Sequence, residues 1–279
     1  MRKLITKLLK KILPRHITDL LIKIVHYKQI QILKKLEFNY HKNTKFLGSD
    51  YGGWSFINNN LLENKFVISA GLGEDASFDV ELISRYNCKI LTVDPTPRAI
   101  EHYNEIIENI GKKNTESYKV GGKQNISSYN LLDVNKENFI LINNALYNVD
   151  DKEIKFYAPP NKKHVSYSIN NWQNNYKETP NFINVKSITV KSILDKFNIK
   201  HLEMIKLDIE GAAAEVIKDM LEKKIFPNQI LVEFDELNKI SKLSIERFFD
   251  VHNIILSNNY RLVKTSSKFP DFLYLRSNF

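Results

Sequence analysis

The stretch VISAGLGEDASFDVELISRYNCKILTVDPTPR, residues 67–98, decides the fold of this chain. Its first residues are typical of a buried strand, and Gly71 and Gly73 allow a sharp turn into a helix and a close approach of a ligand to the backbone. The next strand, KILTVD, ends in Asp94. An acid about 20 residues after such a turn is well placed to accept hydrogen bonds from a ribose. We therefore expect a nucleotide-shaped pocket whose ribose is held by Asp94.

The charge beside this turn narrows the class of ligand. A turn that binds a pyrophosphate normally has a third glycine, so that the phosphates sit on the helix N-terminus. Glu74 and Asp75 occupy that position here. Two carboxylates repel a diphosphate but suit a ligand with a cationic end, such as the sulfonium or ammonium of S-adenosylmethionine. The glycines alone also fit a plain tight turn. The preference for a methyl donor over NAD therefore rests on Glu74 and Asp75.

Three later blocks carry a family resemblance. KLDIEGAAAEVI (206–217) is similar to a Lys-x-Asp-x-Glu-Gly signature, and it is flanked by SITVKSILDKFNI (187–199) and ILVEFDE (230–236). With these blocks the chain resembles a class I S-adenosylmethionine-dependent methyltransferase of the FkbM family, from about residue 50 to the C-terminus. One departure is Ser69, where most methyltransferases of this class have an acid that meets the methionine amino group. Glu74 or Asp75 is expected to take over that contact.

The resemblance implies S-adenosyl-L-methionine as the cofactor and suggests where it would bind. Gly71 and Gly73 would shape the methionine side, and Asp94 with Pro95 would hold the ribose. The turn before Ala145, including Asn144, would lie by the adenine. A lid over the donor is expected from the YGGW segment, which is Tyr51, Gly52, Gly53 and Trp54. The same segment also fits an aromatic plug under the sheet edge.

The whole pattern predicts an α/β fold, a doubly wound seven-stranded and mostly parallel sheet of the Rossmann-like type with an N-terminal helical extension. Strands are expected at 66–70, 89–93, 139–143, 204–208, 229–234, 260–264 and 271–275. Helices are expected at 75–86, 97–110, 189–197, 210–223 and 243–257. Residues 111–138 are interpreted as a loop insertion, KEIKFYA as an extra strand, and 158–182 as either a sugar-binding loop or a plain surface loop.

Catalysis is expected at the carboxyl ends of the first and fourth strands. Methyl transfer to a hydroxyl needs alignment of the acceptor and removal of its proton. Asp208 is the first candidate base, Glu210 the second and His164 the third. Each residue also has a structural interpretation: Asp208 pairs with Lys206, Glu210 caps the next helix, and His164 is solvent-exposed. No Cys/His cluster has the spacing of a zinc site, and no metal site is assigned. A divalent ion held by Asp208, Glu210 and Glu233 stays an open alternative.

Composition supports one catalytic domain (46–279) after a basic amphipathic extension (1–45). The chain has 279 residues, of which 43% are hydrophobic, and a net charge of +9. The first 45 residues contain 12 Lys/Arg and 2 Asp/Glu, whereas the rest contain 29 and 30. A near-neutral catalytic domain weakens a nucleic-acid function. The lone Cys88, and the lack of any apolar run of about 20 residues, indicate a cytoplasmic protein.

The extension leaves two partners open. In KLITKLLKKIL (3–13), leucines and isoleucines recur on one helical face opposite the lysines, and a second helix is expected at 17–36. This pattern fits a peripheral anchor, through residues 1–15, on the inner membrane surface. It also fits a pair of helices docked on the domain or on a second subunit, as in a homodimer.

The function expected from the resemblance and from the 158–182 loop is O-methylation of a sugar hydroxyl, in a surface glycan, lipopolysaccharide or capsule precursor. Such carbohydrate modification has two alternatives. The first is methylation of a small secondary metabolite or a lipid. The second is a catalytically inactive, membrane-associated binding protein of the same fold, because Ser69 replaces the usual acid.

Overall fold

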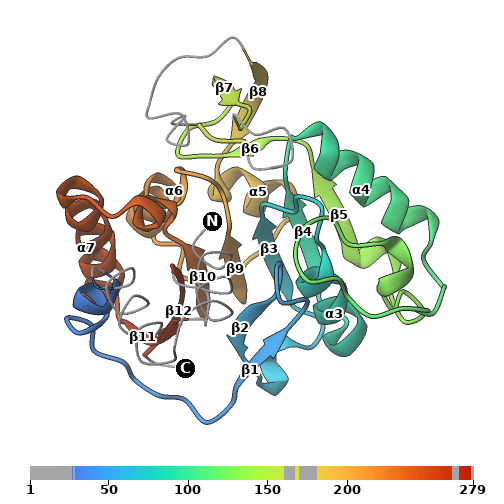
Figure 1. Cartoon of the computed structure of the whole chain (residues 1–279), viewed down its shortest axis with the longest axis horizontal. Helices are drawn as coiled ribbons and strands as arrows, with labels where there is room; N and C mark the ends of the chain where they lie inside the picture. The colour runs from blue at the N-terminus through green and yellow to red at the C-terminus, as the bar shows by residue number, and fades with distance from the viewer. Residues whose placement is uncertain (1–26, 28, 160–166, 170–180, 266–269, 278–279) are drawn as a thin grey trace, which may run out of the picture.

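The computed structural model describes residues 27, 29–159, 167–169, 181–265 and 270–277. Its main strands are β3 (Phe66–Ala70), β4 (Lys89–Val93), β5 (Phe139–Ile142), β9 (Met204–Leu207), β10 (Gln229–Glu233), β11 (Tyr260–Thr265) and β12 (Asp271–Arg276). They form one seven-stranded sheet in the order β11-β12-β10-β9-β3-β4-β5 (Figure 1). Strand β12 is antiparallel to both of its neighbours, and the other pairs are parallel. The predicted fold class is therefore confirmed, with every one of these strands within one residue of its expected range.

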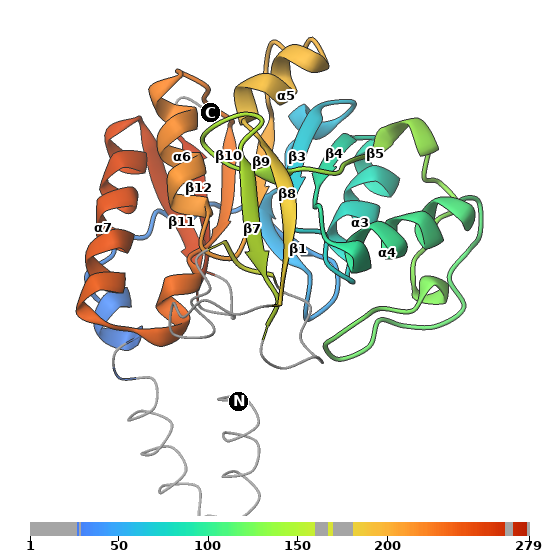
Figure 2. The same cartoon turned by 90° about the horizontal axis from the view of Figure 1, so that it is seen from above.

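Five helices connect these strands. They are α3 (Ser77–Tyr86), α4 (Pro97–Glu108), α5 (Val190–Lys196), α6 (Ala213–Glu222) and α7 (Lys242–Ser257). Figure 2 shows α6 and α7 beside β10, β11 and β12, with α3 and α4 beside β4 and β5. One expected start is wrong, because α6 begins at Ala213 rather than at residue 210. Gly211 has a φ of +79°, a left-handed conformation that ends the strand in a turn before the helix begins.

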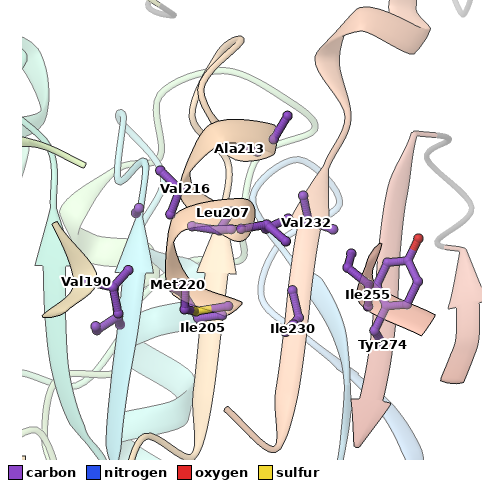
Figure 3. Close-up of a cluster of buried hydrophobic side chains, with 14 of the residues drawn as sticks. Val190, Ile205, Leu207, Ala213, Val216, Met220, Ile230, Val232, Ile255 and Tyr274 are labelled. Carbon is purple, nitrogen blue, oxygen red and sulfur yellow. The ribbon is translucent and has the colours of Figure 1, made fainter. Parts of the chain in front are cut away.

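The core lies on both faces of the sheet. Alternate side chains such as Ile68 and Ile205 join one apolar cluster with α5, α6 and α7, while Val67 and Met204 join another with α3 and α4. Figure 3 shows the first cluster between β9, β10 and α6, including Leu207. Because both faces are covered, the parallel strands are continuous apolar runs, and this is why the sequence located them so well.

Smaller elements extend this framework. The hairpin β1 (Thr44–Leu47) and β2 (Trp54–Ile57) packs on the α3 side of the sheet. A second sheet of β6 (Ala145–Leu146), β8 (Phe182–Ile188) and β7 (Glu153–Tyr157) lies at the opposite end of the view in Figure 1. Strand β7 confirms the expected extra strand KEIKFYA, whereas β1, β2, β6 and β8 were not expected. Strand β1 is short and half-exposed, so its apolar pattern is weak.

The insertion at 111–138 is a loop with two short 3-10 helices, η2 (Ile126–Ser128) and η3 (Lys136–Asn138). It is fixed to the domain by Tyr129, whose hydroxyl accepts a hydrogen bond from the backbone N–H of Ala76 at 3.0 Å and lies 2.8 Å from Nε2 of His102. Burial lowers the pKa of His102 to about 4, so its imidazole is neutral in this contact.

The end of the N-terminal extension packs on the domain. Ile32 and Leu36 are buried in the cluster of α5, α6 and α7, and the backbone N–H of Asn39 donates to Leu262 O at 2.8 Å. Figure 1 shows this segment, in blue, beside α7. Residues 1–26, which carry the proposed membrane anchor, lie outside the described residues. Among the helices that the structure describes, none has the length and apolar character needed to cross a bilayer.

Candidate functional site

The site is built where four parallel strands end side by side. Ala70 of β3 is paired with Val93 of β4 and with Leu207 of β9, which is paired in turn with Val232 of β10. The residues that follow these positions therefore meet at one edge of the sheet: the glycine turn after β3, Asp94 after β4, Asp208 after β9, and Glu233 at the end of β10. This edge is the usual ligand-binding edge of an open α/β sheet.

The two glycines of the turn are needed for different structural reasons. Gly71 has a φ of +86°, and a Cβ placed on it would lie 1.9 Å from the backbone oxygen of Asp208. Only glycine therefore lets the ends of β3 and β9 approach each other this closely. Gly73 has a φ of +56°, and a Cβ there would meet no atom within 4 Å. The space beside the turn is thus open at Gly73, as a bound nucleoside requires.

Asp94 holds the glycine turn. Its Oδ2 accepts hydrogen bonds from the backbone N–H of Leu72 and of Gly73, both at 3.0 Å. Its Oδ1 accepts from the backbone N–H of Thr96 at 2.9 Å and from its hydroxyl at 2.7 Å. A carboxylate has about four lone-pair directions, and these four bonds fill them. The ribose role of Asp94 stays a prediction, and it requires the ribose to replace or share one of these donors.

Asp75 also binds protein groups. It is 9% exposed and accepts hydrogen bonds from the hydroxyl of Ser49, the backbone N–H of Gly52 at 3.1 Å, the amide of Gln124 at 3.2 Å and the backbone N–H of Ser77 at 3.0 Å. The carboxylate thus connects the YGGW segment, the 111–138 insertion and the start of α3. The sequence did not indicate that Asp75 connects these segments, because the most distant partner, Gln124, lies 49 residues away along the chain.

Glu74 is the second acid of the pair beside the turn. Its Oε2 lies 3.7 Å from a guanidinium nitrogen of Arg98 in α4, and its side chain is 12% exposed. Part of the negative charge expected at this point is therefore offset by the protein itself. Contact of Glu74 or Asp75 with the methionine amino group stays a prediction.

The glycines of the YGGW segment are needed for packing. A Cβ on Gly52 would lie 2.5 Å from Cγ of Asp75, and one on Gly53 would lie 2.5 Å from the backbone oxygen of Leu47. Trp54 is 4% exposed as the first residue of β2, so its ring matches the plug interpretation. The segment is therefore a tightly built turn between β1 and β2.

Tyr51 differs from the rest of this segment, because 51% of it is exposed. Its pKa is raised to about 12, first by desolvation of the hydroxyl and then by the negative charges of Asp208, Glu210 and Glu233. The hydroxyl therefore lies in the field of the acids at the ends of β9 and β10. Of the four residues expected to form a lid, Tyr51 is the one that faces the proposed catalytic edge.

Lys206 is a buried cation at the centre of the site. Its Nζ donates to the backbone oxygen of Gly71 at 2.7 Å and lies 4.0 Å from Oδ2 of Asp208. The ammonium also lies 5.7 Å from the ring centroid of Trp54, within reach of a cation–π interaction. The expected pairing of Lys206 with Asp208 is thus present at the outer limit of an ion pair, while the stronger contact holds the glycine turn.

Asp208 and Glu210, the two described candidates for the base, follow β9. The side chain of Asp208 is 34% exposed. Glu210 is half-buried, and its backbone oxygen accepts a bond at 3.4 Å from the hydroxyl of Ser168, a described residue of the 158–182 loop. Glu210 is not the cap of the next helix, because the residue at the N-cap of α6 is Ala212. His164, the third candidate, lies outside the described residues.

Two further acids lie at this edge, of which the sequence indicated Glu233 only as a possible ligand of a divalent ion and did not indicate Asp235. Glu233 ends β10, and Asp235 follows it at 1% exposure, accepting the backbone N–H of Gly211 at 2.8 Å. Burial raises the pKa of both carboxyls well above their usual range, and the charges of Asp208 and Glu210 raise it further. The charge of Asp235 adds to the shift of Glu233. The signal in the sequence was the run VEFDE at the end of a buried strand. No cluster of three or more His, Cys, Asp or Glu side chains suited to a metal ion occurs in the described part of the chain.

The expected adenine side lies next to Asp94. The backbone N–H of Asp94 donates to Ile142 O at 3.2 Å, and Pro95 after it is buried. Asn144 uses its side-chain amide to donate to Lys186 O at 3.2 Å, which joins this turn to β8. Ala145 is buried in β6. These contacts fix the turn beside the sheet edge, and their role toward adenine stays a prediction.

Comparison with known proteins identifies one family for this chain. Residues 58–262 match the model of the methyltransferase FkbM domain, a range that includes the glycine turn, Asp94 and the strand ends that carry Asp208 and Glu233. Neither a curated protein nor a solved structure matches the chain.

Proposed function

The chain belongs to the FkbM methyltransferase family, and on this basis we propose that it transfers a methyl group from S-adenosyl-L-methionine to a hydroxyl of a sugar. The acceptor class proposed is a surface glycan, lipopolysaccharide or capsule precursor. Methyl transfer rests on the family, whereas the donor, the oxygen acceptor and the sugar are the proposal.

One observation carries the donor assignment: the turn is open at Gly73, whose backbone N–H donates to Asp94. A Cβ on Gly73 would meet no atom within 4 Å, so the turn presents bare backbone to a ligand. Gly71, Gly73 and Asp94 would hold the donor, which when bound supplies a methyl group activated by its positive sulfur. The side chain of Asp208 lies at this edge, and a carboxylate there would favour a positively charged sulfonium.

The protein's own contribution is to align the acceptor and take its proton. Asp208 is the carboxylate best suited to this role, because its side chain is 34% exposed and emerges beside the glycine turn. Asp235 is buried and Glu233 is half-buried, and the raised pKa of both carboxyls favours the protonated form. They are therefore suited to hydrogen bonding, and Asp208 remains the proposed base.

The sugar assignment is supported by the segment beyond β7. Residues 158–182 are rich in amide, hydroxyl and aromatic side chains, the groups that bind sugars. The described part of this loop reaches the catalytic edge, since Ser168 is 1% exposed and bonds to Glu210. A small secondary metabolite or a lipid is the alternative acceptor.

One observation favours a second candidate, a non-catalytic binding protein of the same fold. All four lone pairs of Asp94 are used by protein donors, and Ser69 stands where an acid is usual. If these positions contribute no donor contact, the fold would be retained without catalysis.

Isotope transfer separates the candidates. Purified full-length protein is incubated with methyl-labelled S-adenosylmethionine and a panel of monosaccharides or a glycan extract, and the products are analysed by mass spectrometry. We expect label on a sugar oxygen, loss of transfer in Asp208→Asn and unchanged transfer in Asp133→Asn, an exposed acid remote from the site. Donor binding without transfer to any acceptor would support the binding protein instead.

Membrane contact through residues 1–15 and a homodimer also remain proposals. Co-sedimentation with vesicles of anionic and neutral lipids is expected to be salt-sensitive and to be lost when residues 1–15 are removed. Unchanged sedimentation after the truncation would eliminate the anchor. Light scattering of both proteins would report the oligomeric state.

A further inference from the structure

A pocket of about 480 Å³ lies away from the catalytic edge, between helix α3 and the 111–138 insertion. The α3 residues that line it run from Val80, about one turn into the helix, to Arg85. At about 1.5 Å per residue, Arg85 lies about 12 Å along the helix axis from Ser77, the first residue of α3. Its volume is within the range of about 300–1,000 Å³ that is typical of small-molecule sites. Neither the donor nor the acceptor assignment uses this pocket.

The lining combines apolar surface with many hydrogen-bonding groups. Hydroxyl, amide, charged and phenolic side chains come from both walls, among them Glu81, Ser84, Arg85, Asn114, Tyr118 and Asn130. An apolar ligand such as a lipid chain would leave these groups without partners. The lining therefore favours a ligand that offers several donors and acceptors at once.

The charges of the lining are already paired. Arg85 binds Glu81 with an N–O distance of 3.0 Å. Glu116 accepts hydrogen bonds from Ser127 and from Asn125, and these bonds lower its pKa. The positive charge of Lys119, next to the lining, also lowers the pKa of Glu116, so the charged groups of the lining have partners within the protein. The ligand that fits this balance is neutral.

One buried atom in the lining lacks a partner. The amide oxygen of Asn130 is shielded from solvent and makes no hydrogen bond. An unsatisfied buried acceptor is destabilising, so a compensating donor is expected in the functional state. Because Asn130 lines the pocket, the hydroxyl of a bound ligand is a candidate for this donor.

The aromatic wall is held in place by the core. The ring of Tyr118 packs on Tyr129 with the centroids 5.9 Å apart, and the hydroxyl of Tyr129 accepts the backbone N–H of Ala76 at the start of α3. A preformed aromatic face beside hydroxyl and amide groups is a common way to bind a sugar ring, because the ring stacks on its C–H face and bonds through its edges.

We propose that this pocket binds a neutral saccharide, as a site separate from the catalytic edge. The inference does not rest on methyl transfer, because binding here needs neither the donor nor the proposed base. If the protein does methylate a glycan, the pocket would hold a sugar unit remote from the methylated one.

Saturation-transfer NMR and calorimetry with galactose, N-acetylglucosamine and N-acetyllactosamine test the proposal on the full chain. We expect binding of at least one probe, weakened at least tenfold both by Asn130→Ala and by Ser84→Trp, which fills the pocket from a half-exposed position of α3. Asn104→Trp, at an exposed position of α4 outside the pocket, is the matched control and is expected to bind normally. Glucose 6-phosphate is expected to bind more weakly than the neutral probes.

Asp208→Asn separates this site from the proposed function. Saccharide binding that persists in Asp208→Asn, whatever happens to methyl transfer, supports the remote pocket. Loss of binding in Asp208→Asn with normal binding in Ser84→Trp would place the sugar at the catalytic edge and overturn the proposal. Lack of binding of all three neutral probes to the wild-type protein would overturn it as well.

Discussion

The glycine turn after β3 and the acidic edge after β9 and β10 adjoin each other, yet their carboxylates are treated in opposite ways. Asp94 and Asp75 each accept four hydrogen bonds from protein groups. Glu233 and Asp235 are crowded with other acids, which raise the pKa of both carboxyls beyond the effect of burial. Strong perturbation by burial and like charge is typical of functional sites. The carboxylates of the first region, the scaffold, therefore hold the structure together. Those of the second region keep unfavourable charge interactions, as is common for residues that take part in activity.

The largest expected effect is on the scaffold, in Gly71→Ala. Its Cβ would lie 1.9 Å from the backbone oxygen of Asp208, at a φ of +86° that alanine disfavours. We expect a loss of about 3 kcal/mol or more in the free energy of unfolding. Gly73→Ala is the control, with open space around the Cβ and an expected loss of about 1–2 kcal/mol from its φ alone. Denaturant titration measures both, and equal losses would contradict the packing role of Gly71.

The edge is expected to respond in activity instead of stability. Asp208→Asn conserves shape and removes the proposed base, so kcat should fall about 100-fold or more, while unfolding changes by less than about 0.5 kcal/mol. Asp75→Asn should lower the free energy of unfolding, because it removes the charge of a carboxylate that joins three segments of the scaffold. Methyl-transfer kinetics and denaturant titration on both variants give the comparison. Equal losses of stability in Asp208→Asn and Asp75→Asn would contradict the distinction between the two regions.

Asp94 tests whether the scaffold also binds the donor. Replacing it with alanine should weaken the binding of S-adenosylhomocysteine at least tenfold, or about 1.4 kcal/mol, as measured by calorimetry. Thr96→Val is the matched control, since it removes one donor to Asp94 but leaves the carboxylate in place. We expect donor affinity in Thr96→Val to be unchanged or higher, because a lone pair becomes available to the ribose. Equal losses in the two variants would assign to Asp94 a purely structural role.

The same contrast explains what the sequence could predict. The seven strands were located within one residue because they are apolar runs buried on both faces. Gly71 was recognised as a turn residue, but its close approach to β9 depends on a strand more than 130 residues away. The partners of Asp75 and Glu74, namely Ser49, Gln124 and Arg98, are likewise contacts of the folded chain.

The acidic edge was only partly predictable for a related reason. The alternation of side chains along KLDIEG predicted that Asp208 and Glu210 would lie at the strand end. The neighbouring acids Glu233 and Asp235 come from the next strand, and their raised pKa depends on burial that only the folded sheet provides. Residue type and spacing therefore indicated the chemistry. The pairing of the strands determines which acids lie close enough to raise each other's pKa.

The smallest expected effect is a pH dependence that originates at the edge. Burial and neighbouring acids raise the pKa of Glu233 and Asp235 in the folded state, so between the unfolded and folded pKa values the native protein binds more protons than the unfolded chain. The stability contributed by these groups is therefore present at low pH and declines as pH rises through that window. Glu233→Gln should be about 1 kcal/mol more stable than wild type at pH 8, with a smaller gain at pH 5. Glu101→Gln, an exposed position of α4, should show no such difference. Denaturant titrations at both pH values decide the matter, and a Glu233→Gln protein that loses stability at pH 8 would mean that this carboxyl is satisfied like those of the scaffold.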